Sequence, residues 1–419
     1  MVPLKEKLLA LSGGATPLGA NYPATGIPFL RVQNIMPGYL DLSDVEYIEP
    51  EMHRRQLARS CLLPGNVLLT ITGMSYGKAA YVTSALGEAN INQHSVRMAF
   101  SSDLVPEYVA MFLNSRFGKL QSDKLITGIT RPALNYEDIK SILIPVLPMS
   151  QQLAIKELAQ QAEKARQDAT RLYAEADSLL LQELGLGRMA LPTAKTYTAP
   201  FAEVMAAERM DAEFFQPKYY ALLNLLHKTG SAVRLGDYLR SPVKRGMQPN
   251  YVEGGAMPVI KSQHIGPRSI ALDDPDSRTS VEIGETPKNR RALVGYGDVL
   301  LNSTGVNTIG RSQPLLQHTT AWADGHVAIL RPTAGLDPVY LSAFLNSPAG
   351  YMQTERSWTG SSGQIELRPD LVDNYNIWLA PTELQRTIRD MIESAHQLRE
   401  SATGLLAAAQ RRVEEFIQP

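Results

Sequence analysis

Short apolar runs separated by glycine and proline alternate with long helical patterns along this chain. The stretches Leu68–Thr72, Ser141–Pro145 and Val327–Leu330 have the length and the flanking residues of buried strands. Two further stretches, Pro106–Gly118 and Pro338–Gly350, begin with proline and end with glycine, and this pattern predicts a helix in each. Strands and helices mixed in this way predict an α+β fold for each globular part.

A long helix is predicted after each globular part, because apolar residues recur there at alternating spacings of three and four. The first seam consists of Ile155, Leu158, Ala162, Ala165, Ala169, Leu172, Ala176 and Leu179. The second consists of Ile388, Met391, Ala395, Leu398, Ala402, Leu405 and Ala409. We expect the two helices to pair as an antiparallel coiled coil, chiefly through the larger side chains of both seams. These pairing residues are Ile155, Leu158, Leu172, Leu179, Ile388, Met391, Leu398 and Leu405.

The chain contains an internal repeat. Residues 28–35 recur as residues 258–265, and Gly65–Leu69 recurs as Gly297–Leu301. The offset between matching positions starts at 230, is 232 for most of them and ends at 233. Further matches join Gly73 to Gly305, Gly77 to Gly310, Asn114 to Asn346, Gly118 to Gly350, Gln121 to Gln353, and Gln152 to Gln385. Because the order is kept throughout, the sequence predicts two tandem globular domains of the same fold.

Four segments carry a resemblance to a known family. They are Ile27–Ile35, Pro64–Leu69, Gly77–Lys78 and Leu147–Gln152. Together with the order domain, helix, domain, helix, they make the chain resemble the specificity subunits of Type I restriction–modification systems, over nearly its whole length. In that family each of two target-recognition domains reads one half of a bipartite site in double-stranded DNA, and the paired helices set the distance between the halves.

The resemblance implies a domain organisation and a set of partners. The first target-recognition domain would span 1–148, the central helix 149–186, the linker and lead-in segment 187–230, the second target-recognition domain 231–381, and the C-terminal helix 382–419. Besides DNA, the partners would be two methyltransferase (modification) subunits and the restriction or motor subunits. The chain itself would be the non-catalytic specificity subunit.

One segment departs from the repeat. Phe201–Tyr220 resembles the lead-in that such subunits place before a recognition domain. The second domain has this segment and the first does not, since Val2–Leu4 already matches Val233–Leu235. We expect either that the first lead-in has been lost or that the natural chain starts earlier, and that partner docking at the first domain therefore differs from docking at the second.

Composition limits the classes of protein to consider. The chain has 419 residues, of which 44% are apolar and 20% charged, as in globular proteins of two domains. Cys61 is the single cysteine, so neither a disulfide nor a cysteine-based zinc site is expected. No signal-peptide pattern or membrane-length apolar run occurs, which predicts a soluble, cytoplasmic protein without a membrane partner. The net charge of −1 is low for a DNA-binding chain, so we expect partner proteins to supply part of the DNA affinity.

The sequence lacks the usual motifs of catalysis. It contains neither the Asn-Pro-Pro-aromatic or Asp-Pro-Pro-aromatic tetrad of methyltransferases nor a P-loop. Gly13–Gly14 and Gly254–Gly255 lack the third glycine of a nucleotide-binding loop, and Asp273–Asp276 is typical of a solvated turn. His94 and His326 match each other in the repeat without a nucleophile nearby in sequence, which favours a structural role. We predict no enzymatic activity, no cofactor and no metal.

Basic and polar residues of the turns and loops are the candidates for DNA contact, since arginine and lysine bind guanine edges and phosphates while asparagine and glutamine bind adenine. In the first domain they are Arg31, Gln33, Asn34, Arg54, Arg55, Ser75, Tyr76, Lys78, Lys124 and Arg131. In the second they are Lys244, Arg245, Lys261, Gln263, Arg290, Arg291, Asn307, Thr308, Arg311, Arg356 and Arg368. The candidate loops differ between the repeats while the framework matches, as expected if each domain reads a different half-site; neutral drift of surface loops predicts the same difference.

Two other classes of function stay open on the sequence alone. The chain could be a coiled-coil scaffold whose globular domains bind proteins, which its net charge allows. It could also be an enzyme, a nuclease or a methyltransferase, whose site has no recognised motif. A selection on random DNA separates the classes, because a scaffold enriches no sequence.

Overall fold

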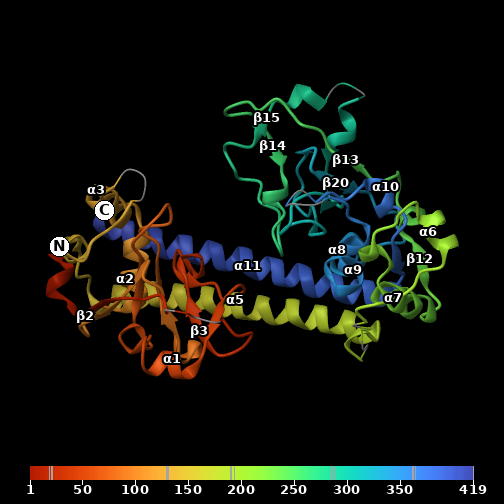
Figure 1. Cartoon of the computed structure of the whole chain (residues 1–419). Helices are drawn as coiled ribbons and strands as arrows, with labels where there is room; N and C mark the ends of the chain where they lie inside the picture. The colour runs from red at the N-terminus through yellow and green to blue at the C-terminus, as the bar shows by residue number, and fades with distance from the viewer. Residues whose placement is uncertain are drawn as a thin grey trace. The chain divides into compact units, whose positions relative to one another are not determined.

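A computed structural model describes residues 1–418 except 18, 20–21, 129–131, 189–190, 193, 285, 287, 361–362 and 364. The chain divides into two compact units. Unit 1 comprises Met1–Asp168 with Leu398–Pro419, and unit 2 comprises Ala169–Gln397. Strands and helices are mixed in both units (Figure 1), so the predicted mixed α and β architecture is confirmed.

Unit 1 is built around an antiparallel sheet in the order β2-β10-β7-β8. Its strands are β2 (Leu8–Gly13), β10 (Ser95–Phe100), β7 (Val67–Thr70) and β8 (Ala79–Tyr81). The helix α2 (Pro106–Asn114) packs on β7 and β8 and is buried along most of its length, because its apolar residues fill the space over the sheet.

A second, smaller sheet in unit 1 has the order β6-β3-β9, in which β3 runs parallel to β9. Two further pairs are β4 with β5 and β1 with β11. The bounds are β6 (Glu46–Ile48), β3 (Ile27–Leu30), β9 (Asn90–Ile91), β4 (Ile35–Met36), β5 (Tyr39–Leu40), β1 (Val2–Pro3) and β11 (Leu143–Ile144). The remaining short helices are α1 (Pro50–Arg54) and α4 (Tyr136–Ser141).

Unit 2 has a four-stranded sheet in the order β13-β20-β17-β18 and another in the order β15-β14-β19-β16, in which β14 runs parallel to β19. A separate pair joins β12 to β21. The strands are β13 (Lys244–Arg245), β20 (Val327–Leu330), β17 (Val299–Asn302), β18 (Ser312–Pro314), β15 (Arg278–Thr279), β14 (Met257–Ile260), β19 (Ala321–Ala323), β16 (Leu293–Val294), β12 (Ala232–Arg234) and β21 (Asn376–Trp378). The predicted strand at 327–330 is therefore confirmed.

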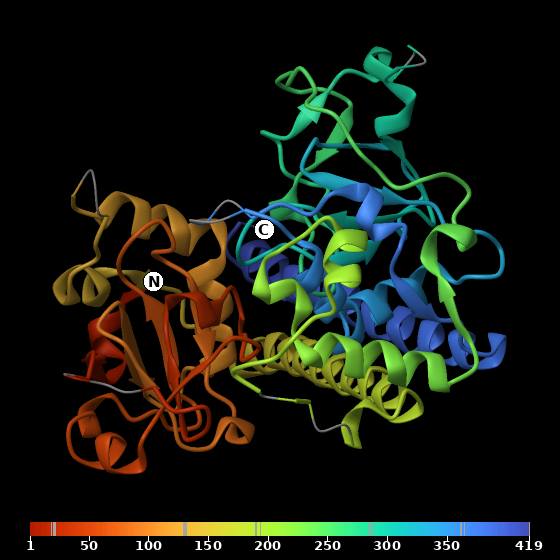
Figure 2. The ribbon, with the colours of Figure 1, turned by 45° about the vertical axis from the view of Figure 1, so that its right-hand side comes forward.

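The helices of unit 2 lie at one end of these sheets, beside the β12–β21 pair (Figures 1 and 2). They are α6 (Phe201–Ala207), α7 (Pro217–Lys228), α8 (Pro338–Asn346), α9 (Pro348–Ser357) and α10 (Pro369–Val372). Helix α8 packs on β17 and β18, as α2 packs on β7 and β8 in unit 1.

The prediction that one helix runs from Pro106 to Gly118 is wrong. Helix α2 ends at Asn114, and α3 (Arg116–Leu125) begins after Ser115, whose hydroxyl oxygen accepts a hydrogen bond from the backbone of Gly118. Glycine does not end the helix there. It lets the two helices meet closely, because a Cβ at Gly118 would lie 2.3 Å from the carbonyl oxygen of Phe112.

The same correction applies to the second copy. Helix α8 ends at Asn346 and α9 begins at Pro348, so the predicted helix 338–350 is two helices. A Cβ at Gly350 would lie 2.3 Å from the carbonyl oxygen of Leu345. The glycine signal was real in both copies, but its cause is a close contact between the second helix, which contains the glycine, and the backbone of the first helix.

The two long helices are α5 (Met149–Glu183) and α11 (Thr382–Ile417). In unit 1, Ile155, Ala162 and Ala402 belong to one hydrophobic cluster with α2 and the main sheet. In unit 2, Leu180 and Ile388 belong to the cluster that contains α8 and β21. Each end of the two helices is therefore part of the core of the unit it belongs to.

The buried stripe of α5 differs by one residue from the predicted seam. The predicted positions Ile155, Ala162, Ala165, Ala169 and Ala176 are buried. Ala159, Tyr173 and Leu180, however, are more deeply buried than the predicted Leu158, Leu172 and Leu179. Both stripes satisfy a heptad pattern. Between Ala162 and Ala169 the predicted Ala165 is buried, and the next residue, the half-buried Arg166, places its guanidinium 3.2 Å from the ring centre of Tyr39. An arginine at this position made the observed stripe look polar in the sequence.

The second long helix differs from its predicted seam in the same direction. The predicted positions Ile388, Ala395, Ala402 and Ala409 are all fully buried. The predicted positions Met391, Leu398 and Leu405 are only partly buried, whereas Leu406 and Val413 are buried. In the described part of the chain no helix is both long and apolar enough to cross a membrane.

Candidate nucleic-acid interface

A glycine-flanked loop follows the central strand of the main sheet in each unit. In unit 1 it runs from Gly73 to Gly77, where both glycines have positive φ angles of 75° and 80°. In unit 2 it runs from Gly305 to Gly310, with φ angles of 96° and 81°. Only glycine adopts this conformation without strain, so the four glycines hold two tight, partly exposed loops in corresponding places.

Corresponding backbone hydrogen bonds anchor the two loops. Gly73 donates to the carbonyl of Pro132 at 3.0 Å, and Gly305 donates to that of Ile365 at 3.3 Å. Leu134 donates to Ile71 at 2.9 Å in unit 1, as Leu367 donates to Ser303 at 2.8 Å in unit 2. The loops carry the candidates Ser75, Tyr76, Lys78, Asn307, Thr308 and Arg311. Their bases are rigid, so the side chains between the glycines are the variable part.

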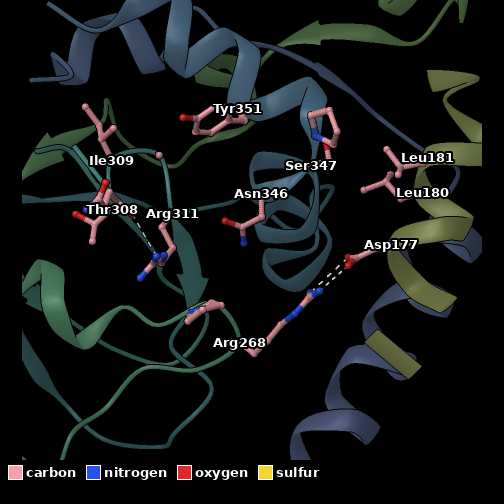
Figure 3. Close-up of a pocket in the computed structure, with 14 residues that line it drawn as sticks. Asp177, Leu180, Leu181, Arg268, Thr308, Ile309, Arg311, Asn346, Ser347 and Tyr351 are labelled. Carbon is pink, nitrogen blue, oxygen red and sulfur yellow. Dashed lines mark hydrogen bonds and ion pairs between the residues drawn. The ribbon is translucent and has the colours of Figure 1, made fainter. Parts of the chain in front are cut away.

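The loop of unit 2 forms one wall of a cleft of about 420 Å³ (Figure 3). Helix α5 supplies the opposite wall, and the junction of α8 and α9 closes one side. The lining residues are Asp177, Leu180, Leu181, Pro267, Arg268, Asn307, Thr308, Ile309, Gly310, Arg311, Asn346, Ser347, Pro348 and Tyr351. Three of the sequence candidates, Asn307, Thr308 and Arg311, are thus brought together here.

Two arginines in this cleft differ in their electrostatic setting. Arg268 is bound to Asp177 by two hydrogen bonds of 3.4 and 2.5 Å and lies 4.6 Å from the ring centre of Tyr173. Arg311 donates only long hydrogen bonds of 3.4 and 3.3 Å, to the backbone carbonyls of Ile265 and Asn307. Among the described residues no carboxylate forms an ion pair with Arg311. Its positive charge is therefore available to an external anion.

Sequence reasoning missed Arg268 and Tyr351, which also line this cleft. Arg268 sits in a turn after Gly266 and Pro267, and it faces the cleft because Asp177 on α5 holds it there (Figure 3). A turn of this kind is a weak signal, since the sequence does not reveal that it meets α5.

The loop of unit 1 carries an aromatic side chain in place of the threonine of unit 2. The hydroxyl of Tyr76 donates a 2.8 Å hydrogen bond to Asp123 on α3, and this bond raises the pKa of Tyr76. Lys78, on the strand side of the loop, is half-buried, and Lys124 on α3 is exposed. Arg131, another candidate of this region, lies outside the described residues.

Asn34, one of the predicted DNA contacts, is buried and has a structural role in the turn after β3. Its side chain is 2% exposed, accepts from the backbone of Arg31 and donates to the carbonyls of Asp41 and Asp44. His264 occupies the corresponding place in unit 2, where its Nδ1 bonds the backbone N–H of Lys261 at 3.1 Å. Both side chains cap a short turn after β3 or β14 and have no free group for a base.

Three candidate arginines form ion pairs, hydrogen bonds or ring contacts with other residues of the chain. Arg31 lies 3.3 Å from Glu46 and 3.9 Å from Asp44. Arg245 bonds Glu366 and, at 2.7 Å, the carbonyl of Leu367. Arg356 stacks 4.3 Å from the ring centre of Phe214, and its burial lowers its pKa. These partners hold strands, loops and the lead-in segment together. As DNA contacts the three arginines stay predictions, and each shares its charge with a group of the protein.

The other candidates keep more of their surface. Gln33, Arg54, Arg55, Lys124, Lys244, Gln263, Arg290, Arg291, Asn307 and Arg368 are exposed. Arg55 pairs with Glu51 at 3.0 Å and Arg368 with Asp370 at 2.6 Å, both at the surface. Lys261 lies 4.6 Å from the ring centre of Tyr251. Surface pairs of this kind contribute little and exchange readily for a phosphate.

The acidic turn at residues 273–276 has a structural role. Asp274 accepts from the backbone of Asp276 at 3.0 Å and from the hydroxyl of Ser277 at 2.6 Å, and it pairs with His264 at 2.9 Å. The hydrogen bond from Ser277 is the largest of several contacts that lower the pKa of Asp274. Within the described ranges no cluster of three histidine, cysteine, aspartate or glutamate residues could hold a metal ion.

Comparisons with known proteins give structural neighbours only. No protein-family model and no curated protein matches the chain. The structure is similar to the S subunit of the Type I restriction–modification system from M. genitalium, with a TM-score of 0.45 and 10% identity, over 98% of this chain and 94% of that chain.

Two further solved structures are similar over nearly the full length. One is the HsdS subunit from Thermoanaerobacter tengcongensis, with a TM-score of 0.32 and 17% identity, over 99% of this chain and 95% of that chain. The other comes from work on the complex assembly and conformational transition of the type I R-M system, with a TM-score of 0.32 and 18% identity, over 99% and 96%.

Proposed function

We propose that the chain is the DNA-specificity subunit of a Type I restriction–modification system, and that each unit reads one half of a bipartite DNA site. The observation that carries the proposal is the pair of corresponding glycine-flanked loops with different side chains. Two domains of one fold that read different half-sites need a common framework and different reading loops.

A tandem duplication supports this interpretation. The sheet order β2-β10-β7-β8 in unit 1 has its counterpart in β13-β20-β17-β18 in unit 2. The parallel pairing of β3 with β9 has its counterpart in β14 with β19, and β1–β11 corresponds to β12–β21. We place the recognition domains at 1–148 and 231–381, separated by the central helix 149–186 and the linker and lead-in 187–230, with the C-terminal helix at 382–419.

The long helices would set the distance between the half-sites as an antiparallel coiled coil. Unit 1 contains the first part of α5 and the last part of α11 in one cluster, whereas unit 2 contains the last part of α5 and the first part of α11. This order supports an antiparallel pair. A helix of 35 residues is about 52 Å long at 1.5 Å per residue.

In this function Arg311, Asn307 and Thr308 bind DNA from unit 2, and Ser75, Tyr76 and Lys78 bind it from unit 1. Arg311 and Lys78 occupy matching positions and would contact a phosphate or a guanine edge. The exposed basic residues Arg54, Arg55, Arg290 and Arg291 would add salt-dependent affinity for the backbone. The chain would carry no catalytic step itself and would direct two methyltransferase subunits and the restriction subunits to the site.

The test is the methylation pattern of host DNA with and without this gene, read by single-molecule sequencing. We expect the loss of one motif made of two short specified segments with a fixed unspecified gap between them. Loss of a single uninterrupted motif would show that only one unit reads DNA. An unchanged pattern, together with no enrichment of any sequence from random DNA by the purified chain with a co-expressed methyltransferase, would overturn the proposal in favour of a protein-binding scaffold.

A further inference from the structure

In unit 2 the outer face of α9 and β21 is covered by the lead-in segment. The short turn Ala212–Phe215 packs on α9, and α7 packs on both α9 and β21 (Figure 1). Met352 on α9 is only 6% exposed as a result. A small cavity of about 160 Å³ remains between the two sides, lined by Leu222 and Leu223 of α7 and by Met352.

Specific polar contacts fasten this cover. The ammonium group of Lys218 on α7 lies 2.6 Å from the carboxylate of Glu355 on α9. The guanidinium of Arg356 stacks on Phe214 at 4.3 Å and on Tyr220 at 5.2 Å, and its Nε donates to the carbonyl of Phe214 at 3.2 Å. The lead-in segment is thus held on α9 by the carboxylate of Glu355 and the guanidinium of Arg356, in addition to its apolar contacts.

The corresponding face of unit 1 is formed by α3 and β11. Gln121 on α3 exchanges two hydrogen bonds with the backbone of Leu143 on β11, at 3.0 and 2.8 Å. Gln353 on α9 makes the same two bonds to Asn376 on β21, at 2.9 and 2.7 Å. These matching bonds establish which residues of the two faces correspond. Leu120 corresponds to Met352, Asp123 to Glu355, and Lys124 to Arg356.

This face of unit 1 is uncovered by the described residues. Leu120 is 63% exposed and Leu143 is 42% exposed, while Asp123 and Lys124 are also exposed. Asp123 accepts a hydrogen bond from Tyr76, but among the described residues it has no cationic partner. Asp123, Lys124 and Leu120 therefore correspond to the three residues that hold the lead-in segment in unit 2. Among the described residues, no such segment lies on them in unit 1.

We propose that this α3–β11 surface, made of Leu120, Gln121, Asp123, Lys124 and Leu143, is a docking site for a helix of a partner protein. The partner helix is amphipathic and aromatic, and it has the chemistry of residues 212–228 of this chain. One of its lysines pairs with Asp123, an aromatic ring stacks on Lys124, and leucines cover Leu120. Charge complementarity selects this occupant, because the same charges hold the same kind of helix in unit 2. The proposal does not depend on DNA binding.

The test uses a fluorescent synthetic peptide of residues 209–230 as the probe and the intact chain as the receptor. Fluorescence anisotropy should show saturable binding. The substitution Leu120→Glu should weaken it about tenfold or more, because it places a charge against the leucines of the peptide. The matched control is Leu63→Glu, which changes another exposed leucine of unit 1 and should leave the affinity unchanged.

A charge exchange tests whether the peptide repeats the pairing of Lys218 with Glu355 that unit 2 makes. A peptide with Lys218→Glu should bind the natural chain more weakly, and the variant Asp123→Lys should restore its binding. Absence of binding, or equal binding by the Leu120→Glu variant, would overturn the proposal. A dimer of the chain that Leu120→Glu dissociates in sedimentation would assign the surface to a second copy and would also contradict the partner proposal. Folding of each variant is checked by hydrogen exchange of α2 and α3.

Discussion

The two units share their internal hydrogen bonds and differ in what they present to the outside. Asn114 in unit 1 exchanges bonds of 3.0 and 2.7 Å with the backbone of Ala79 at the sheet edge. Asn346 in unit 2 exchanges bonds of 2.9 and 2.8 Å with Ser312. Tyr108 donates to the carbonyl of Pro145 and Tyr340 to that of Trp378, at 2.6 and 2.7 Å.

These framework residues are the ones that match in the sequence repeat. A buried backbone group must find a partner, and the side chain that supplies it cannot change without leaving that group unpaired. In the loops and outer faces, water can bond the backbone, so the side chains there are free to change. Likeness between the units therefore follows the groups that pair with buried backbone, while the loops and outer faces differ.

The largest expected effect tests the shared framework. Gly118→Ala and Gly350→Ala should each cost roughly 3 kcal/mol or more, because each new Cβ would press on a backbone carbonyl that cannot move freely. Hydrogen exchange should show lost protection in α2 and α3 for the first variant, and in α8 and α9 for the second.

The control for this pair is Gly404→Ala on α11. A Cβ there meets nothing within 4 Å, so the same substitution should stabilise the exposed helix by about 0.5–1 kcal/mol. A small effect of Gly118→Ala alone would show that the junction of α2 and α3 is looser than that of α8 and α9. The two units would then differ in their framework and not only at their surfaces.

The second prediction concerns the covered face. Arg356→Ala should destabilise unit 2 by about 2 kcal/mol, because it removes the stacking on Phe214 and Tyr220 and a hydrogen bond to the backbone. The matched change Lys124→Ala in unit 1 should stay within about 0.5 kcal/mol.

Thermal unfolding followed by hydrogen exchange of α7 and α3 measures both changes. Arg356→Lys gives an intermediate check, since lysine keeps the charge without the planar group. Equal losses for Arg356→Ala and Lys124→Ala would mean that the face of unit 1 is also covered, and the contrast between the units would disappear.

The third prediction concerns the loops. Arg311→Ala should reduce DNA affinity by about 1–2 kcal/mol and lower the salt dependence by about one phosphate contact. Lys78→Ala should do the same through the other half-site. Binding is measured on DNA that carries the motif found by methylation sequencing, with each half-site scrambled in turn.

The charge-matched control is Arg386→Ala on α11, because that exposed arginine pairs with Glu383 at 2.5 Å and is not among the candidate DNA contacts. If Arg311→Ala weakens binding equally on the natural site and on a site with a scrambled half, the loop contacts the backbone and reads no sequence. Such a result would mean that the loops position the protein on the DNA backbone and that other residues distinguish the two half-sites.

The sequence predicted the framework well where local signals and the repeat agreed. The strand at 327–330 and the long helices needed only periodicity and flanking turns. The helix junction at Ser115 was missed because Gly118 looked like a helix end, whereas a contact between two helices requires it. The stripe of α5 was placed one residue away because Arg166 stacks on Tyr39, a contact that lies far from it in sequence.

The candidate site was predicted less completely for a similar reason. The sequence does not distinguish an arginine that braces the fold from one that faces solvent. Arg245 and Arg356 are bound to residues more than a hundred positions away, and Arg31 to a strand that no sequence signal placed beside it. Arg311 and Lys78 stay candidates because their loops were located correctly by their glycines.

The smallest expected effect concerns one buried framework position where the units differ in charge. Asp298 accepts from the backbone of Gly295 at 3.0 Å in unit 2, and Asn66 accepts from Leu63 at 3.0 Å in unit 1. Burial raises the pKa of Asp298, although Arg240 and Arg331 lie near its carboxylate at 3.3 and 3.6 Å. Folding therefore makes protonation of this carboxyl easier than it is in the unfolded chain.

The sign of the pH dependence follows from that shift. The stability that Asp298 contributes is full below the pKa of the unfolded chain and is lost as the pH rises through the higher pKa of the folded state. Asp298→Asn keeps the backbone acceptor without the charge, as in unit 1, and should leave unit 2 unchanged or up to about 1 kcal/mol more stable at pH 7. The difference from the natural chain should shrink as the pH falls toward 4. Urea unfolding at several pH values measures it. A loss of stability at pH 7 would mean that the two arginines outweigh burial, and that unit 2 depends on a charge that unit 1 does without.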